Sequence, residues 1–77
     1  MRKKIKKINA AILIIGNEIL SGRTQDKNIA FICSWLNSRC GISVKEVRVI
    51  PDLEKIIIDN VLNLSKKFNY VFTTGGI

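Results

Sequence analysis

Histidine is absent from this chain of 77 residues, so no Ser-His or Cys-His nucleophile can form within it. There are two cysteines, Cys33 and Cys40, and neither lies in a CxxC spacing, which leaves a zinc site unsupported. The longest apolar run, Ala10 to Ile15, is far shorter than the ~20 residues that a membrane span needs. GxGxxG and GxxxxGK[ST] are also missing, so the usual dinucleotide fold and a P-loop are both unsupported. We expect a reduced, cytoplasmic protein with no membrane partner.

Acidic residues are few, six against thirteen basic ones, and the net charge is +7. Five of the basic residues lie within the first seven positions, so the excess belongs mainly to an N-terminal tail, residues 1–9. Such a tail can bind nucleic acid or another anionic surface through counterion release. Because no aromatic residue interleaves the basic ones, we favour a solvated tail. A small basic nucleic-acid-binding protein is kept as an alternative.

The rest of the chain, residues 10–77, reads as one small globular domain, since 47% of the residues are apolar. The continuous run at 10–15 predicts a strand buried on both faces, which Gly16 ends. After a polar segment, Asp26 can cap a helix over 27–39, which Gly41 ends. One face of that helix carries Ile29, Ile32, Cys33 and Leu36.

A second strand is predicted over 42–50, and its charged residues place it at a sheet edge. Its apolar alternation changes phase between Val44 and Val47, which indicates a bulge. Pro51 ends this strand and Asp52 can cap a second helix, before a third strand at 69–72. The apolar face of this second helix consists of Leu53, Ile57, Val61, Leu64 and Phe68. The order β-α-β-α-β predicts a parallel three-layer α/β sandwich with strand order 2-1-3.

Two loops follow the carboxyl ends of the first and third strands, where parallel sheets bind ligands. They offer hydroxyls, carboxylates and glycine N–H groups, a mixture suited to a phosphorylated ligand bound with a divalent metal. Simpler interpretations stay open: a solvated loop carboxylate at Glu18, a helix cap at Asp26, a turn at Ser21-Gly22, and a strand end at Thr73-Thr74. The candidate ligand-binding residues are Gly16, Glu18, Ser21, Gly22, Thr73, Thr74, Gly75 and Gly76.

Three stretches together carry a family resemblance: AILIIGNEILSG at 11–22, VRVIPD at 47–52 and NYVFTTGGI at 69–77. In this order and separation they resemble the MoaB/Mog molybdopterin-binding domain family, and more closely its competence/damage-inducible CinA branch. The resemblance implies a three-layer α/β fold that binds molybdopterin or a related phosphorylated ligand. It also implies metal-dependent hydrolysis of ADP-ribose, with magnesium as a possible cofactor in full-length members.

This chain departs from that family pattern after the second glycine pair. Family members continue there with a Gly-Pro-Thr stretch and acidic residues that are candidates for metal binding and catalysis, whereas this sequence stops at Ile77. We expect the front half of such a domain, with an incomplete pterin or ADP-ribose site and no activity by itself. The alternative is one half of a split pyrophosphatase that a separately encoded C-terminal half completes.

Overall fold

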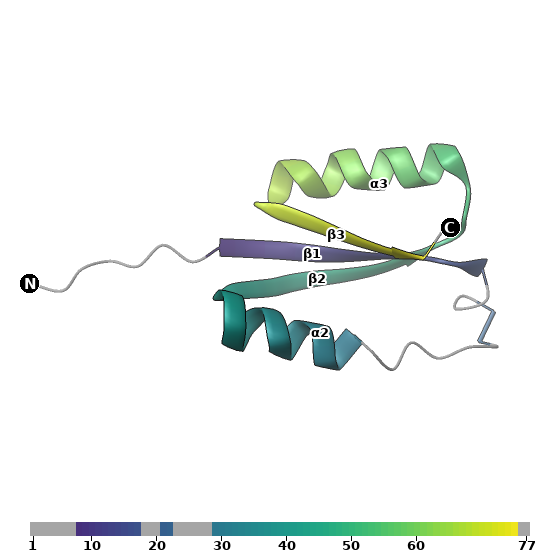
Figure 1. Ribbon diagram of the computed structural model, residues 1–77. Coiled ribbons are helices and arrows are strands. Elements are labelled where there is room, and N and C mark those ends of the chain that lie inside the picture. Colours follow the sequence, from purple (N-terminus) through teal and green to yellow (C-terminus); the bar gives the residue numbers. More distant parts are fainter. Residues whose placement is uncertain (1–7, 18–20, 23–28, 76–77) are drawn as a thin grey trace, which may run out of the picture.

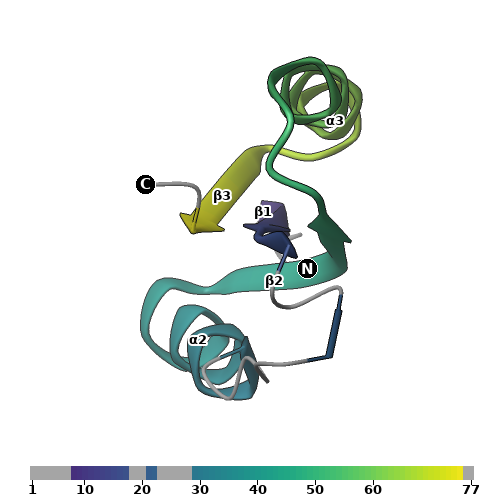
Figure 2. The same cartoon turned by 90° about the vertical axis from the view of Figure 1, so that its right-hand side faces the viewer.

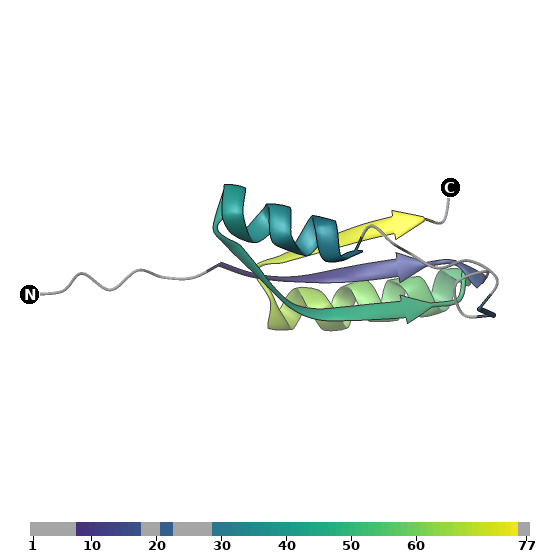
Figure 3. The same cartoon turned by 90° about the horizontal axis from the view of Figure 1, so that it is seen from below.

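The computed structural model describes residues 8–17, 21–22 and 29–75, and within them three parallel strands form one sheet (Figure 1). The strands are β1 (Ile8–Ile15), β2 (Ile42–Ile50) and β3 (Tyr70–Gly75), in the order β2-β1-β3. All three arrows point the same way (Figure 3), and helices α2 (Ile29–Trp35) and α3 (Glu54–Lys67) cover opposite faces (Figure 2). The predicted α/β class and strand order 2-1-3 are confirmed.

Strand β1 is the centre of the molecule because it pairs on both sides and is buried on both faces. Its residues from Ala10 to Ile15 are all buried, as the unbroken apolar run predicts. Alternate side chains of β1 point to opposite faces. Ala11, Leu13 and Ile15 pack with Leu64 of α3, so this face of the strand forms the core beneath α3.

Strand β2 contains the predicted bulge, and the bulge accounts for the change of phase in its sequence. Ala10 pairs with Val44 and the next residue, Ala11, pairs with Glu46, so Lys45 is the extra residue. The added residue puts Val44 and Val47 on the same face of the sheet although they are three positions apart. Val44, Val47 and Val49 therefore lie on one face, the one that α2 covers (Figure 2), whereas Ile50 packs in the core with Leu64 of α3.

The two helices end as their sequences indicate, but α3 begins differently. A π-helical turn (Leu36–Cys40) follows α2, and Gly41, in the left-handed region at φ 69°, donates its N–H to the Leu36 carbonyl. At α3 the prediction that Asp52 caps the helix is wrong, because Leu53 occupies the N-cap and makes no side-chain cap bond. The candidate cap Asp26 lies outside the described residues. No helix in the described part of the chain is long and apolar enough to cross a membrane.

Strand β3 is longer than predicted. It continues past Phe72 through Thr73 and Thr74 to Gly75, each residue in register with β1. Threonine is a good strand former, and the buried β1 beside it supplies a partner for its backbone. The two threonines therefore lie within a strand and not in a loop after it.

A polar clamp of Glu46, Arg48, Asn60, Asn63 and Lys67 fixes α3 against β2. The Arg48 guanidinium donates to Asn60 Oδ1 and to Asn63 Oδ1, both at 2.9 Å, and to the Glu46 carboxylate. Lys67 Nζ lies 3.4 Å from the other Glu46 oxygen. The hydrogen bond from Arg48, with a smaller contribution from Lys67, lowers the pKa of Glu46 below its usual value of 4.5.

Candidate functional site

The carboxyl ends of β1 and β3 lie side by side, which brings the two predicted ligand segments to one edge of the sheet (Figure 2). Ile14 is in register with Thr74, and Ile15 is in register with Gly75. Gly16, the first residue after β1, therefore lies beside the end of β3. This edge is where open parallel sheets bind ligands, because the loops that leave neighbouring strands meet there.

Gly75 is required by the approach of the two strands themselves. Its φ of +81° is a conformation that side chains with a Cβ rarely adopt. A Cβ built at this position would lie 2.2 Å from the Ile15 carbonyl oxygen, far inside contact distance. The glycine that the sequence suggested for a ligand thus has a structural reason in the packing of β3 on β1.

The backbone of the first loop is tied to the protein at two points. The N–H of Gly16 donates to the Ile50 carbonyl at 3.0 Å, and the N–H of Ser21 donates to the Asn17 carbonyl at 2.9 Å. The N–H of Gly16 is therefore already bonded within the protein, and the role of Gly16 in ligand binding stays a prediction. Gly16 is also buried.

Asn17 and Asp52 belong to this edge although sequence reasoning assigned neither of them to the site. The side-chain oxygen of Asn17 accepts the backbone N–H of Asp52 at 3.2 Å, across 35 positions in the chain. The end of β2 therefore joins the ends of β1 and β3 in forming the edge. No local pattern signals this contact, since it depends on β2 lying next to β1.

The other candidates are placed as follows. Ser21 and Gly22 are exposed in a turn, Thr73 is exposed on β3 and Thr74 is half-buried. Glu18 and Gly76 lie outside the described residues, so the structure leaves their ligand-binding roles as predictions. Within the described ranges, no three acidic, cysteine or histidine side chains come together as a metal site. These residues do not fit a divalent metal by themselves.

Comparison with known proteins identifies the family. Residues 11–77 match the family described as a probable molybdopterin binding domain. The chain belongs to this family. The CinA-type resemblance of the sequence is confirmed as well, since a putative competence-damage inducible protein of Pediococcus pentosaceus is 37% identical over 70 residues.

Two other relatives show how widely this domain is distributed. A probable FAD synthase of Caenorhabditis briggsae is 40% identical over 68 residues, which are 88% of this chain and 13% of that protein. Among solved structures, the protein CinA of Thermoplasma acidophilum matches with a TM-score of 0.82 and 32% identity. The match covers 92% of this chain and 41% of the Thermoplasma acidophilum chain. This member of the molybdopterin-binding family therefore spans less than half the length of that relative.

Proposed function

We propose that this chain supplies one part of a binding site for a phosphorylated pterin or nucleotide, in the cytoplasm, and that it is inactive by itself. The observation that carries the proposal is the register of Ile15 with Gly75. This pairing places the start of the G-x-E-x-L-x-G segment (16–22) next to the T-T-G-G segment (73–76). The family description supports a pterin ligand, and the name of the FAD synthase relative supports a nucleotide. FAD and ADP-ribose share a pyrophosphate group, so phosphate is the chemistry common to these ligands.

The proposal is tested by titrating the whole chain with ADP-ribose and following backbone amide shifts by NMR. We expect millimolar binding at best, equivalent to about 4 kcal/mol, because this chain matches only 41% of the Thermoplasma acidophilum protein. Shifts should centre on Gly22, Thr74 and Gly75, and ribose without phosphate should produce none. A matched variant with glutamine at positions 2, 3, 4, 6 and 7 separates site binding from simple charge attraction. Shifts that are lost in that variant would overturn the proposal.

Catalysis is the second part of the test. Metal-dependent hydrolysis needs ligands that hold the ion as well as a pocket for the substrate. The described residues do not form such a ligand set. We expect the purified chain with magnesium or manganese to hydrolyse ADP-ribose at no more than the background rate. Turnover that Glu18→Gln abolishes would refute inactivity.

A split enzyme is the second candidate, and the exposed β3 edge favours it. In the order β2-β1-β3, strand β3 has a neighbour on one side only among the residues that the structure describes, and Tyr70 at its start is 49% exposed. The remainder of the Thermoplasma acidophilum protein, beyond the region that matches this chain, is a suitable stand-in for a separately encoded C-terminal half. Mixing the two chains should give a stable heterodimer and ADP-ribose hydrolysis if this candidate is right. If the two chains do not associate, the split-enzyme candidate is excluded for this pair of chains.

A further inference from the structure

Asn17 is bonded in two directions at the start of the first loop. Its side-chain oxygen accepts the Asp52 N–H at 3.2 Å, and its backbone carbonyl accepts the Ser21 N–H at 2.9 Å. The preceding residue, Gly16, is fixed to Ile50 at 3.0 Å. One residue thus connects the loop after β1 both to its own turn and to the turn between β2 and α3.

The turn between β2 and α3 has one donor that Asn17 can satisfy. Pro51 has no N–H, and the Leu53 N–H donates back to the Pro51 carbonyl at 2.9 Å. The Asp52 N–H lies between them and reaches the Asn17 side chain. Asp52 is exposed, and the bond from its N–H to Asn17 ties this turn to the first loop.

We propose that Asn17 is a positioning residue, which holds Gly16 and the turn at Ser21-Gly22 at a fixed place relative to the end of β2. This inference rests on the proposed function for its consequence, since a fixed loop binds a phosphorylated ligand with less ordering cost. Asn17 is itself exposed, so burial does not account for its two bonds. The ligand edge is then formed by three strand ends and not by two.

The test compares Asn17→Ala with Asn37→Ala. Asn37 is also exposed but lies on the π-helical turn, away from this edge, so the second variant makes the same deletion elsewhere. In Asn17→Ala we expect the Asp52 amide to exchange with solvent about three- to tenfold faster, and the Ser21 and Gly22 amides to shift. In Asn37→Ala these amides should be unchanged. Asn17→Asp keeps an acceptor and should retain the protection of Asp52.

Affinity for ADP-ribose supplies the readout that a purely structural role would not move. Asn17→Ala should raise the Kd about three- to tenfold while the urea midpoint stays close to that of Asn37→Ala. An unchanged Asp52 exchange rate, or an unchanged Kd in a chain that does bind ADP-ribose, would overturn the proposal. If the wild-type chain binds no ADP-ribose, the proposed function fails. The loop-positioning role is then decided by whether the Ser21 and Gly22 amides change in Asn17→Ala alone.

Discussion

Replacing Gly75 by alanine tests whether the second glycine segment is fixed by packing. The substitution places a residue with a Cβ at φ +81°, which costs roughly 1–2 kcal/mol. It also brings that Cβ to 2.2 Å from the Ile15 oxygen, where ordinary contacts begin at 3.4 Å. Since the obstacle is backbone, β3 must move away from β1, and overpacking of this kind costs about 1–3 kcal/mol. We expect a total loss of about 2–5 kcal/mol.

That loss is large for a chain of 77 residues, whose whole stability is expected to be about 4–12 kcal/mol. Gly41→Ala is the matched control, because its φ is also positive, at 69°, and nothing lies within 4 Å of its added Cβ. It should lose only about 1 kcal/mol. Urea unfolding followed by far-UV circular dichroism measures both, with a slope near 1 kcal/mol/M. Equal midpoints for the two variants would show that the close approach of Gly75 to Ile15 does not limit stability.

The remaining predictions concern pH and association. The folded-state pKa of Glu46 is lowered, so its contribution to stability is present above about pH 4.5 and is lost as the pH falls through the lower folded value. The difference in urea midpoint between wild type and Glu46→Gln should therefore shrink between pH 6 and pH 3; a difference that is independent of pH would contradict the ion pair. The chain should also associate through β3, because Tyr70–Gly75 contains no charged residue and, in the described part of the chain, pairs only with β1. Sedimentation velocity at ~100 µM should show less association for Tyr70→Lys than for Leu62→Lys, which adds the same charge on α3 in place of a side chain that is 55% exposed. A stable wild-type monomer with a dispersed proton NMR spectrum would contradict this prediction.

The sheet could be predicted because its signals are local. The apolar run of β1 and the phase change in β2 each come from a few consecutive residues, and they gave the central strand, the edge strand and the bulge. The end of β3 was placed three residues early, because Thr73 and Thr74 suit both a strand and a loop. Only the register with Ile14 and Ile15 resolves that choice.

The contacts of the site were harder to predict because they join distant positions. Asp52 is a residue type that often caps helices, but Leu53 takes the N-cap position of α3, and the N–H of Asp52 donates to the side chain of Asn17. Similarly, Gly16 looked like a free donor until β2 was placed beside it, with the Ile50 carbonyl within hydrogen-bond distance. In both cases a strand neighbour that is remote in sequence decides how a backbone group is used.

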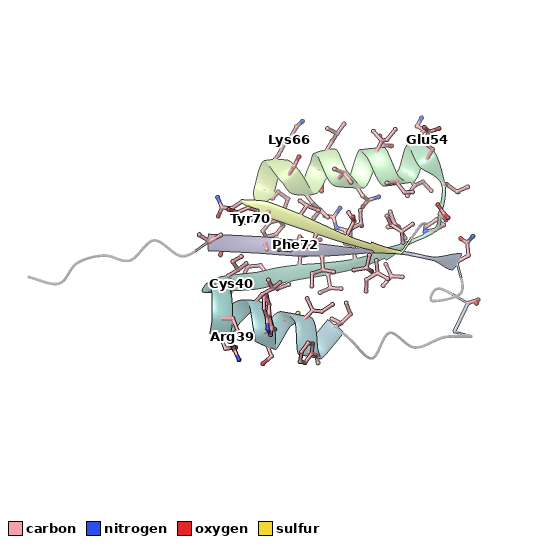
Figure 4. All side chains as sticks on the ribbon, in the orientation of Figure 1. Arg39, Cys40, Glu54, Lys66, Tyr70 and Phe72 are labelled. Carbon is pink, nitrogen blue, oxygen red and sulfur yellow. The ribbon has the colours of Figure 1, made fainter. Side chains whose placement is uncertain are left out.

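Within the described residues, the bulge at Lys45 makes the β2 edge of the sheet less suited to a further strand than the β3 edge. At the outer side of β2 a new strand would meet an interrupted row of backbone groups, together with the ion pair of Glu46 and Arg48 nearby. At the outer side of β3, the row from Tyr70 to Gly75 is regular and uncharged, and the rings of Tyr70 and Phe72, which Figure 4 labels, stack on each other. Of the two edges that the structure describes, the β3 edge therefore suits a further strand better, and such a strand would lie next to the Thr73–Gly75 segment.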